Sequence, residues 1–322
     1  MKSSGLAVIA IGGNSLITDS RRVSVENQYK AIQKTVRHIA DVIESGRQVV
    51  VTHGNGPQVG FILRRSEIAR KVAGMHPVPL ASCVADTQSA IGWQIQQALA
   101  NELKLRKVKE QNRGKAVTVV TQVLVDSDDP AFAAPSKFIG EFFTDEDLPT
   151  LKKDFPHWVI KQDSSRGWRR VVPSPKPQAI IELDAIRSLL ANGFNVVAVG
   201  GGGIPVIADA KGELRGIAAV VDKDFASRLL AVDLKADLFV ISTAVEAVCI
   251  NFGQPDQKIL GRVSAAEMRG HYAEGQFPAG SMGPKVKAAL EFLESGGGEV
   301  VITCPQNLKN AIGSNGGTHI VP

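Results

Sequence analysis

The chain has 322 residues, of which 44% are hydrophobic and 21% charged, an ordinary balance for a globular protein long enough to bury a sizeable core. Its net charge of +5, from 37 Lys and Arg against 32 Asp and Glu, includes no block of five like charges, which argues against nucleic-acid binding and suits small anionic ligands. Cys83, Cys249 and Cys304 are far apart and odd in number. We therefore expect no disulfide framework and no CxxC metal site, and a reducing, cytoplasmic compartment.

The first apolar run, residues 6–11, is shorter than the apolar region of a signal peptide. It leads into Gly12-Gly13-Asn14 with no small-x-small cleavage site, so a buried strand is the favoured interpretation. No stretch approaches 18 apolar residues, and we expect no membrane span.

Amphipathic helices and short apolar strands then alternate. Apolar residues at steps of three and four predict a helix over residues 25–45, with Ser24 as its N-cap and Gly46 after its end. Strands are expected at 48–52 and 116–124. Between them a second amphipathic helix carries Ile91, Ile95, Leu99 and Leu103.

The middle of the chain, residues 127–173, is different, because Pro, Phe, Trp and charged residues interrupt any periodicity; it predicts an inserted lobe. Alternation then resumes. The later elements expected are a helix over 182–192, a strand over 194–199, a helix after Asp224, a strand over 238–242, a helix after Pro284 and a strand over 300–303. Strands alternating with helices predict an α/β fold with a mostly parallel sheet covered on both faces.

Three of these strands end in glycine-rich turns, at Gly12 to Ser15, His53 to Pro57 and Gly200 to Gly203. Ligands of open α/β sheets bind beyond the carboxyl ends of the strands, and glycine lets backbone N–H groups approach an anion closely. The three turns together predict a phosphate or carboxylate site at one edge of the sheet. For any one of them, a simple tight turn remains an alternative.

Several named motifs are missing. There is no GxxxxGK[ST], which excludes a P-loop, and Gly54, Gly56 and Gly60 lack the GxGxxG spacing of a dinucleotide site. The Gly-x-Ser-x-Gly of a hydrolase is absent, and the six histidines show no zinc spacing. His53, which follows a strand, is interpreted as a packed histidine rather than a catalytic one.

Lysines are the expected catalytic groups if the anion is a phosphoryl group, since its transfer depends on positioning and charge neutralisation. Lys285 follows Pro284 at the start of an expected helix, where a cation is unfavourable by a few tenths of a kcal/mol unless an anion binds. Asp224, after Lys223, is either an N-cap or an organiser of Lys223 and Lys285 or of magnesium. Lys137 alone would be assigned to the surface.

A small basic cluster, Arg166, Arg169 and Arg170, lies in the irregular middle of the chain. It is interpreted as a solvated or subunit-contact face rather than a nucleic-acid site.

In their order along the chain, these motifs resemble those of bacterial carbamate kinases, within the amino acid kinase family. The likeness runs from about residue 6 to Ile320. The segments that carry it are Ala10 to Asn14, Thr52 to Gly60, Val84 to Gln88, Lys137, Arg166 to Val172, Gly200 to Pro205, Lys223-Asp224, Gly280 to Lys285 and Thr318 to Ile320.

The resemblance implies an open αβα sandwich with a small inserted lid. A lobe for carbamate and the phosphoryl group would comprise residues 1–126 and 174–224, the lid 127–173, and the nucleotide-binding lobe 225–322. The implied reaction is carbamoyl phosphate + ADP ⇌ carbamate + ATP with magnesium, in a cytoplasmic homodimer that makes ATP in the breakdown of arginine, agmatine or allantoin. No protein-held metal site and no nucleic-acid or membrane partner is implied.

Residue roles follow by position. Lys285 would neutralise the phosphates, Lys223 would stand near the nucleotide and Asp224 would organise the lysines. Many amino acid kinases have a first-strand lysine where this chain has Ala10, and Lys137 of the lid would replace it. The implied phosphate- and substrate-binding residues are Gly12, Gly13, Asn14, Ser15, Gly54, Asn55, Gly201 and Gly202, and the implied nucleotide-binding residues are Thr243, Val245, Met282 and Pro284.

Some positions depart from the family pattern. Phe138 and Glu141 stand where prolines are common, Ala247 replaces a usual lysine, and Ser242-Thr243-Ala244 lacks the Asp that many relatives carry. Two alternatives therefore stay open: a related kinase acting on another small acid, and a catalytically weak regulatory paralogue. The absent first-strand lysine argues against the first, and the intact Lys137, Lys223, Asp224 and Lys285 argue against the second.

Overall fold

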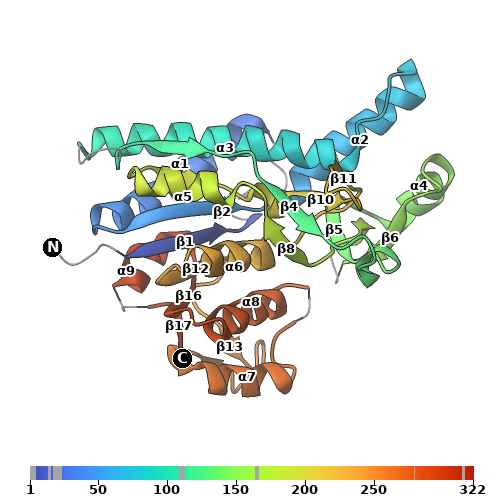
Figure 1. Ribbon diagram of the computed structural model, residues 1–322. Coiled ribbons are helices and arrows are strands. Elements are labelled where there is room, and N and C mark those ends of the chain that lie inside the picture. The colour runs from blue at the N-terminus through green and yellow to red at the C-terminus, as the bar shows by residue number, and fades with distance from the viewer. Residues whose placement is uncertain are drawn as a thin grey trace.

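The computed structural model describes residues 5–13, 16, 24–108, 113–163, 167–278, 280–313 and 316–322. Within these residues, a mostly parallel sheet of eight strands forms the centre of the molecule (Figure 1). Every neighbouring pair in it is parallel except β16 and β17. The order across the sheet is β15 (Arg262–Ser264), β17 (Thr318–Val321), β16 (Glu299–Thr303), β12 (Leu238–Ser242), β1 (Leu6–Ile11), β2 (Gln48–His53), β9 (Asn195–Val197) and β3 (Ala116–Thr118).

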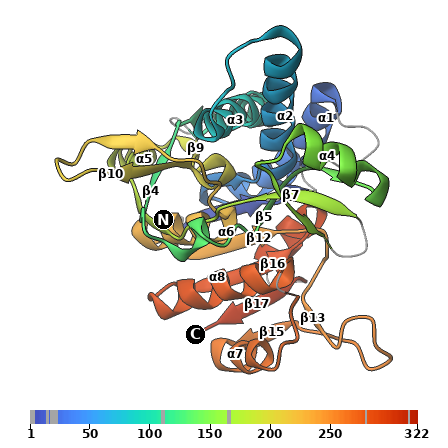
Figure 2. The same ribbon diagram turned by 90° about the vertical axis from the view of Figure 1, so that its right-hand side faces the viewer.

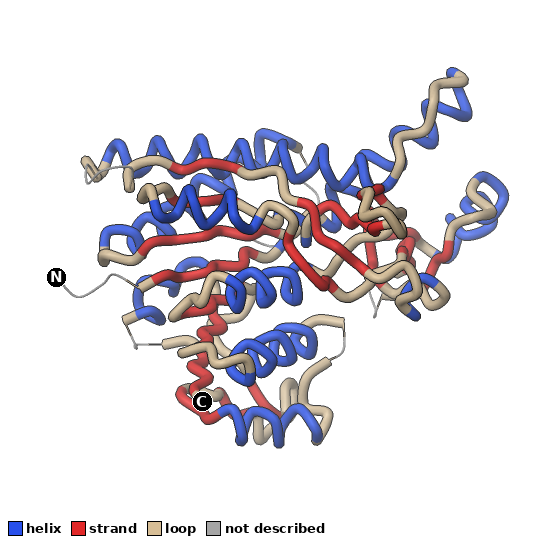
Figure 3. Tube along the Cα trace, viewed as in Figure 1, coloured by secondary structure: helices blue, strands red, loops and turns tan. Residues whose placement is uncertain are grey.

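Helices cover both faces of this sheet, as Figure 3 shows. One face packs against α1 (Val25–Glu44), α3 (Leu80–Leu105) and α9 (Leu308–Ile312), and the other against α5 (Leu183–Ala191), α6 (Lys223–Asp233), α7 (Ala265–Ala273) and α8 (Met282–Glu294). Side chains alternate along a strand, so Ile9 of β1 packs with the first group and Val8 with the second. The predicted α/β fold with a covered, mostly parallel sheet is confirmed.

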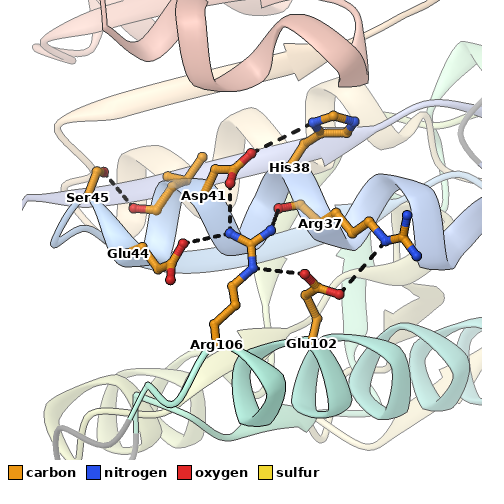
Figure 4. Close-up of polar contacts among 8 residues, drawn as sticks. Arg37, His38, Asp41, Glu44, Ser45, Glu102 and Arg106 are labelled. Carbon is orange, nitrogen blue, oxygen red and sulfur yellow. Dashed lines mark hydrogen bonds and ion pairs between the residues drawn. The ribbon is translucent and has the colours of Figure 1, made fainter.

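An arginine at the end of α3 fastens α3 to α1 (Figure 4). The guanidinium of Arg106 pairs with Asp41 at 2.7 Å and with Glu44 at 2.6 Å, and its Nε donates to Glu102 at 2.8 Å. Its remaining nitrogen donates to the backbone oxygen of Arg37. Because planar guanidinium donors have fixed directions, this contact holds the C-terminal ends of the two helices in a defined arrangement.

Two smaller sheets and a projecting helix flank the carboxyl edge of the central sheet. One sheet has the order β11 (Leu214–Gly216), β10 (Ile204–Ala208), β4 (Gln122–Val125) and β8 (Pro177–Ile180). The other, β5 (Lys137–Phe143), β7 (Trp168–Val172) and β6 (Val159–Gln162), joins α4 (Leu148–Asp154) to form what we call the lid. Figure 2 shows the lid beside α2 (Gly56–Ala73).

The shorter elements complete the described chain. A hairpin of β13 (Cys249–Ile250) and β14 (Lys258–Ile259) lies in the C-terminal part. Single 3-10 turns occupy Pro130–Phe132, Asp145–Asp147, Gly200–Gly202 and Pro305–Asn307. The described helices include none whose length and apolar character would let it cross a lipid bilayer.

Two expected strands differ from the structure. The strand expected over 116–124 is divided, because β3 belongs to the central sheet and β4 to a flanking one. The chain changes sheets at Thr121, whose backbone N–H donates to the Gln88 side chain instead of to a strand. The strand expected over 194–199 ends at Val197, because Val199 has a left-handed backbone with φ of 52°.

Two glycines, Gly60 of α2 and Gly140 of β5, allow the lid to pack closely against α2. A Cβ added to Gly60 would lie 2.1 Å from the Cα of Gly140, closer than any real contact. The lid strand β5 therefore passes α2 at backbone distance, which only glycine at position 60 permits.

Gly60→Ala should consequently lower the free energy of unfolding by about 1–3 kcal/mol, because the added methyl must push β5 away from α2. Gly270→Ala is the matched control, since Gly270 lies within α7 with no atom within 4 Å of its would-be Cβ. This control should be neutral or stabilise by up to about 1 kcal/mol. Urea unfolding of both variants measures the difference; equal stability of the two would contradict the close packing.

Candidate active site

The first two glycine turns follow the adjacent strands β1 and β2. Each turn is hydrogen-bonded to the end of a neighbouring strand. The N–H of Gly12, after β1, donates to the Ser242 carbonyl at the end of β12, at 3.1 Å. The N–H of Gly54, after β2, donates to the Ile11 carbonyl at the end of β1, also at 3.1 Å. Gly13 is exposed. Asn14 and Ser15, which the sequence also placed here, lie outside the described residues.

Gly54 lies close to the side chain of Lys223 and to Gly13 of the first turn. A Cβ at Gly54 would lie 3.4 Å from Cδ of Lys223 and 3.8 Å from the backbone nitrogen of Gly13. Gly13, Gly54 and Lys223 thus border one space, which the backbone nitrogen of Gly13 and the side chain of Lys223 both approach. That combination suits an oxyanion.

The third glycine turn packs against Asn55, the residue that follows Gly54. Gly201 and Gly202 are buried, and a Cβ on them would lie 2.2 Å from Asn55 Nδ2 and 2.3 Å from the Val221 carbonyl. Close packing therefore already requires glycine at both positions, and their role in binding a phosphate stays a prediction. Asn55 in turn is buried and donates to Thr87 Oγ1 at 2.8 Å, which links the second turn to α3.

The side chains of Gln88 in α3 and of Thr121, just before β4, hold this third turn in a strained conformation. Val199 is β-branched and left-handed, a combination that costs on the order of 1–3 kcal/mol and persists only when its surroundings enforce it. Its N–H donates to Thr121 Oγ1 at 3.0 Å, and the Gln88 amide donates to the Gly200 carbonyl at 3.0 Å. The sequence motif at Val84 to Gln88 carried no assigned role, and these contacts supply one.

The N-terminus of α6 carries two acidic residues with different tasks. The N-cap is Asp222, whose Oδ1 accepts the N–H of Asp224 at 2.8 Å, so the N-cap alternative for Asp224 is wrong. Asp224 is only 3% exposed and pairs with two lysines from different helices. Its Oδ1 accepts from Lys223 at 2.7 Å and its Oδ2 from Lys285 of α8 at 3.2 Å.

These charges shift one another's ionisation. Burial opposes ionisation of Asp224, but the ammonium groups of Lys223 and Lys285 outweigh it and hold the pKa of this carboxyl below its usual range. Burial lowers the pKa of Lys223; the charge of Asp224 opposes this shift and the like charge of Lys285 adds to it. An incoming anion would relieve the repulsion between the two ammonium groups.

Lys137 reaches the same place from the lid. It is the first residue of β5, and its Nζ lies 2.5 Å from Oδ2 of Asp222. The sequence-predicted residues Lys137, Lys223, Asp224 and Lys285 therefore come together at the start of α6. Asp222 was missed, although an Asp directly before an expected helix is a typical N-cap.

His53, at the end of β2, is completely buried beside the turns. Burial lowers its pKa to about 4, so the imidazole is neutral near pH 7. Its Nδ1 lies 3.1 Å from the Gly54 carbonyl and must carry the proton, because a carbonyl only accepts. Its Nε2 has no hydrogen-bond partner, and the ring packs against Gly200, which is consistent with a structural histidine.

A cavity of about 770 Å³ opens beside Lys285, between α8, the loop after β12 and the residues just before β17. Such a volume is typical of small-molecule sites. Of the residues expected to bind nucleotide, Thr243, Val245 and Met282 line it, whereas Pro284 does not. Lining residues that the sequence did not identify include Glu246, Cys249, Phe252, Gln276 and Phe277.

The basic cluster of the lid is not a surface patch. The side chains of Arg169 and Arg170 are 12% and 16% exposed and pair with Asp163 and Glu67. Arg170 also lies 4.5 Å from the ring centre of Trp158. The expectation of a solvated or subunit-contact face is therefore wrong for these two arginines, because they hold the lid together and to α2; Arg166 lies outside the described residues.

The side chains of Phe138, Glu141 and Ala247, three of the departures from the family pattern, are accommodated without conflict. The ring of Phe138 lies 5.8 Å below the guanidinium of Arg169, and Glu141 pairs with Arg64 of α2. Ala247 lines the cavity, where its methyl group leaves room that a longer side chain would fill. The two lid departures thus take part in fastening the lid.

Comparison with known proteins agrees with this geometry. The model of the amino acid kinase family matches residues 5–304. The chain is 50% identical over 316 residues to the carbamate kinase-like protein YahI of Escherichia coli, and 44% identical over 315 residues to the carbamate kinase of Thermococcus kodakarensis. Each alignment covers 98% of both proteins.

Solved structures of Giardia lamblia carbamate kinase are similar throughout. The structure bound to citric acid gives a TM-score of 0.92 at 36% identity, and the one bound to AMP-PNP gives 0.88 at 37% identity. Both comparisons cover 100% of this chain and 99% of the other.

His53→Gln should change how stability depends on pH. The folded pKa near 4 lies below the ordinary histidine pKa of 6.5, so the unfolded chain binds this proton first as pH falls. The stability contributed by neutral His53 is complete above pH 6.5 and declines by about 1.4 kcal/mol per pH unit down to about pH 4. The variant should lack this slope in urea unfolding, while the exposed His76→Gln control keeps it. Equal slopes for wild type and His53→Gln would contradict the assignment.

Proposed function

The chain belongs to the amino acid kinase family, and we propose that it is a kinase that transfers a phosphoryl group between carbamoyl phosphate and ADP, forming carbamate and ATP. The observation that carries this proposal is the convergence of Lys137, Lys223 and Lys285 on two aspartates, beside the glycine turns and the cavity.

Phosphoryl transfer requires an in-line arrangement of the two substrates and neutralisation of the charge on the transferred group. In this proposal the amides of Gly13 and Asn14, with Ser15 and Asn55, hold the carbamoyl and phosphoryl oxygens. The N–H groups of Gly12 and Gly54, which were also predicted to do so, already donate to the carbonyls of Ser242 and Ile11. Lys285 and Lys137 neutralise the phosphoryl group, and Lys223 stands between it and the nucleotide. Asp224 orients Lys223 and Lys285, which supports a fixed cation arrangement before substrate binds.

The nucleotide would occupy the cavity next to Lys285. Its mostly apolar lining, with Phe277 and Met282, suits a purine ring, and Gln276 and Glu246 offer polar groups. The AMP-PNP-bound Giardia relative, an ATP-analogue complex, supports this proposal. Thr243, Val245 and Met282 would contact the nucleotide, and Pro284 would shape the turn that presents Lys285.

Magnesium would accompany the nucleotide phosphates and neutralise part of their charge. Among the described residues no group of three His, Cys, Asp or Glu could hold a metal, and the carboxylates of Asp222 and Asp224 are committed to lysines. This donor set fits magnesium held chiefly by substrate phosphates and water, its usual mode in kinases.

We further propose the division into a carbamate and phosphoryl lobe (1–126 and 174–224), a lid (127–173) and a nucleotide lobe (225–322). The separate lid sheet and the position of the cavity, with lining residues from Thr243 to Gly317, support this division. Cytoplasmic location is supported by three free cysteines. A homodimer working in arginine, agmatine or allantoin breakdown follows from the family resemblance, and the exposed Trp93 of α3 is available for such a contact.

The test is ATP formation from carbamoyl phosphate and ADP, with and without magnesium, measured through hexokinase and glucose-6-phosphate dehydrogenase. Rapid, magnesium-dependent ATP formation is the expected result. A folded protein that binds ADP but forms no ATP would instead indicate another acyl phosphate or a regulatory paralogue. The absence of ATP formation would be informative because the Escherichia coli relative is called carbamate kinase-like rather than carbamate kinase.

Lys285→Ala and Lys137→Ala should each lower kcat by roughly 100- to 1,000-fold, the usual effect of removing one preorganised charged donor. Lys287→Ala is the control on the same helix, because its ammonium group lies over Phe225 rather than beside Asp224. It should retain wild-type kcat. Full activity in Lys137→Ala would remove the lid lysine from the mechanism.

A further inference from the structure

One carboxylate connects the lid to the catalytic helix. Asp222 uses Oδ1 to cap α6 and Oδ2 to pair with Lys137, 85 residues earlier in the chain. The side chains of Lys137 and Asp222 are 27% and 20% exposed, so the pair is largely removed from water. Asp222 is not among the residues that line the nucleotide cavity.

Helix capping alone does not account for this residue. Asn and Ser cap helices about as well as Asp, with no charge to desolvate. An ionised carboxylate that is four-fifths buried needs compensating positive charge, and the cation that it pairs with directly is Lys137. The need for a helix cap therefore explains a side-chain oxygen at position 222. The pairing with Lys137 explains why that side chain also carries a negative charge.

Two other ion pairs of the lid, among the described residues, lead to a different part of the protein. Lys71 with Asp154, and Arg170 with Glu67, join the lid to α2. These contacts fix the outer part of the lid. The inner end of β5, which carries Lys137, meets α6 through Asp222. A backbone hydrogen bond from Val220 to Pro173 joins the same two regions and keeps the chain segments near each other without orienting a side chain.

We propose that Asp222 is a positioning residue that docks the lid lysine Lys137 beside Lys223 and Lys285, so that three ammonium groups are assembled before the phosphoryl group binds. This inference rests on the proposed function. Three lysines against Asp222 and Asp224 leave one net positive charge, which a phosphoryl group can neutralise. Without Asp222, repulsion from Lys223 and Lys285 would drive Lys137 outward and return the lid strand to solvent.

An inhibitory role for Asp222 would predict the opposite change in kcat. If Asp222 instead withheld Lys137 from the substrate, removing its charge would release the lysine and raise activity. Kinetics therefore separate a positioning residue from an inhibitory contact.

Asp222→Asn is the informative variant, because it keeps the N-cap and removes the charge. We expect kcat for ATP formation to fall by about 10- to 100-fold, less than in Lys137→Ala, because the lysine is present but poorly placed. KM for ADP should remain that of the wild type. In a Lys137→Ala background the same substitution should change kcat by less than about twofold, since Asp222 acts through Lys137.

Three results would overturn the proposal: wild-type kcat in Asp222→Asn, an increase in kcat, or an equal loss with and without Lys137. Asp154→Asn is the control, because it breaks the other lysine–aspartate pair of the lid, which is remote from α6. It should keep wild-type kcat. A loss equal to that of Asp222→Asn would mean that general loosening of the lid accounts for the effect.

Hydrogen exchange of substrate-free protein tests the contact independently of the reaction. Amides of Lys137 to Phe143 should exchange faster in Asp222→Asn than in the wild type, and unchanged exchange would contradict docking by Asp222. If the wild type forms no ATP from carbamoyl phosphate, the proposed function fails, and the exchange experiment still decides whether Asp222 holds the lid strand.

Discussion

The site depends on one buried carboxylate that two lysines share. Asp224 is almost completely buried, and its two oxygens meet Lys223 of its own helix and Lys285 of α8. A buried charge is tolerated only when paired, and removing one partner of such a pair typically costs about 3–5 kcal/mol. Asp224 therefore ties the starts of α6 and α8 to each other. The position of Lys285, and with it the edge of the cavity, follows from this contact.

The parallel sheet supplies the other half of the arrangement. Because β1 and β2 are parallel neighbours, their carboxyl ends bring Gly13 and Gly54 to one edge, opposite Lys223. Within β1, Ala10 is completely buried in the core that includes α6. The first strand therefore contributes no cation. The lid provides one in Lys137, which Asp222 receives at the start of α6. Substrate oxygens would thus meet amides from the sheet and ammonium groups from two helices and the lid.

Local patterns predicted much of the fold and part of the site. Apolar periodicity located α1 and α3, and glycine after apolar runs located the turns at the carboxyl edge of the sheet, because both signals are local in sequence. Lys285 could be singled out because a lysine at a helix start is electrostatically unfavourable without an anion. Longer-range features could not be predicted in this way. The pairing of Lys137 with Asp222 joins residues 85 apart, and Lys137 entered the site only through family resemblance.

Other differences have the same origin in tertiary structure. Arg169 and Arg170 are buried by partners elsewhere in the lid and on α2, which a local cluster of arginines does not reveal. The strand expected over 116–124 changes sheets at Thr121 because Gln88 of α3 takes up its backbone N–H. Position 199 is left-handed although valine disfavours that conformation, and the contacts of Thr121 and Gln88 explain why it is tolerated.

The most direct test of the account is the rate of ATP formation from carbamoyl phosphate and ADP by Asp224→Asn, measured on protein whose circular dichroism matches the wild type. With the shared charge removed, Lys223 and Lys285 repel each other and lose their orientation. We predict that kcat falls by at least about 100-fold. A folded Asp224→Asn protein that kept kcat within about tenfold of the wild type would contradict the claim that this carboxylate organises the site.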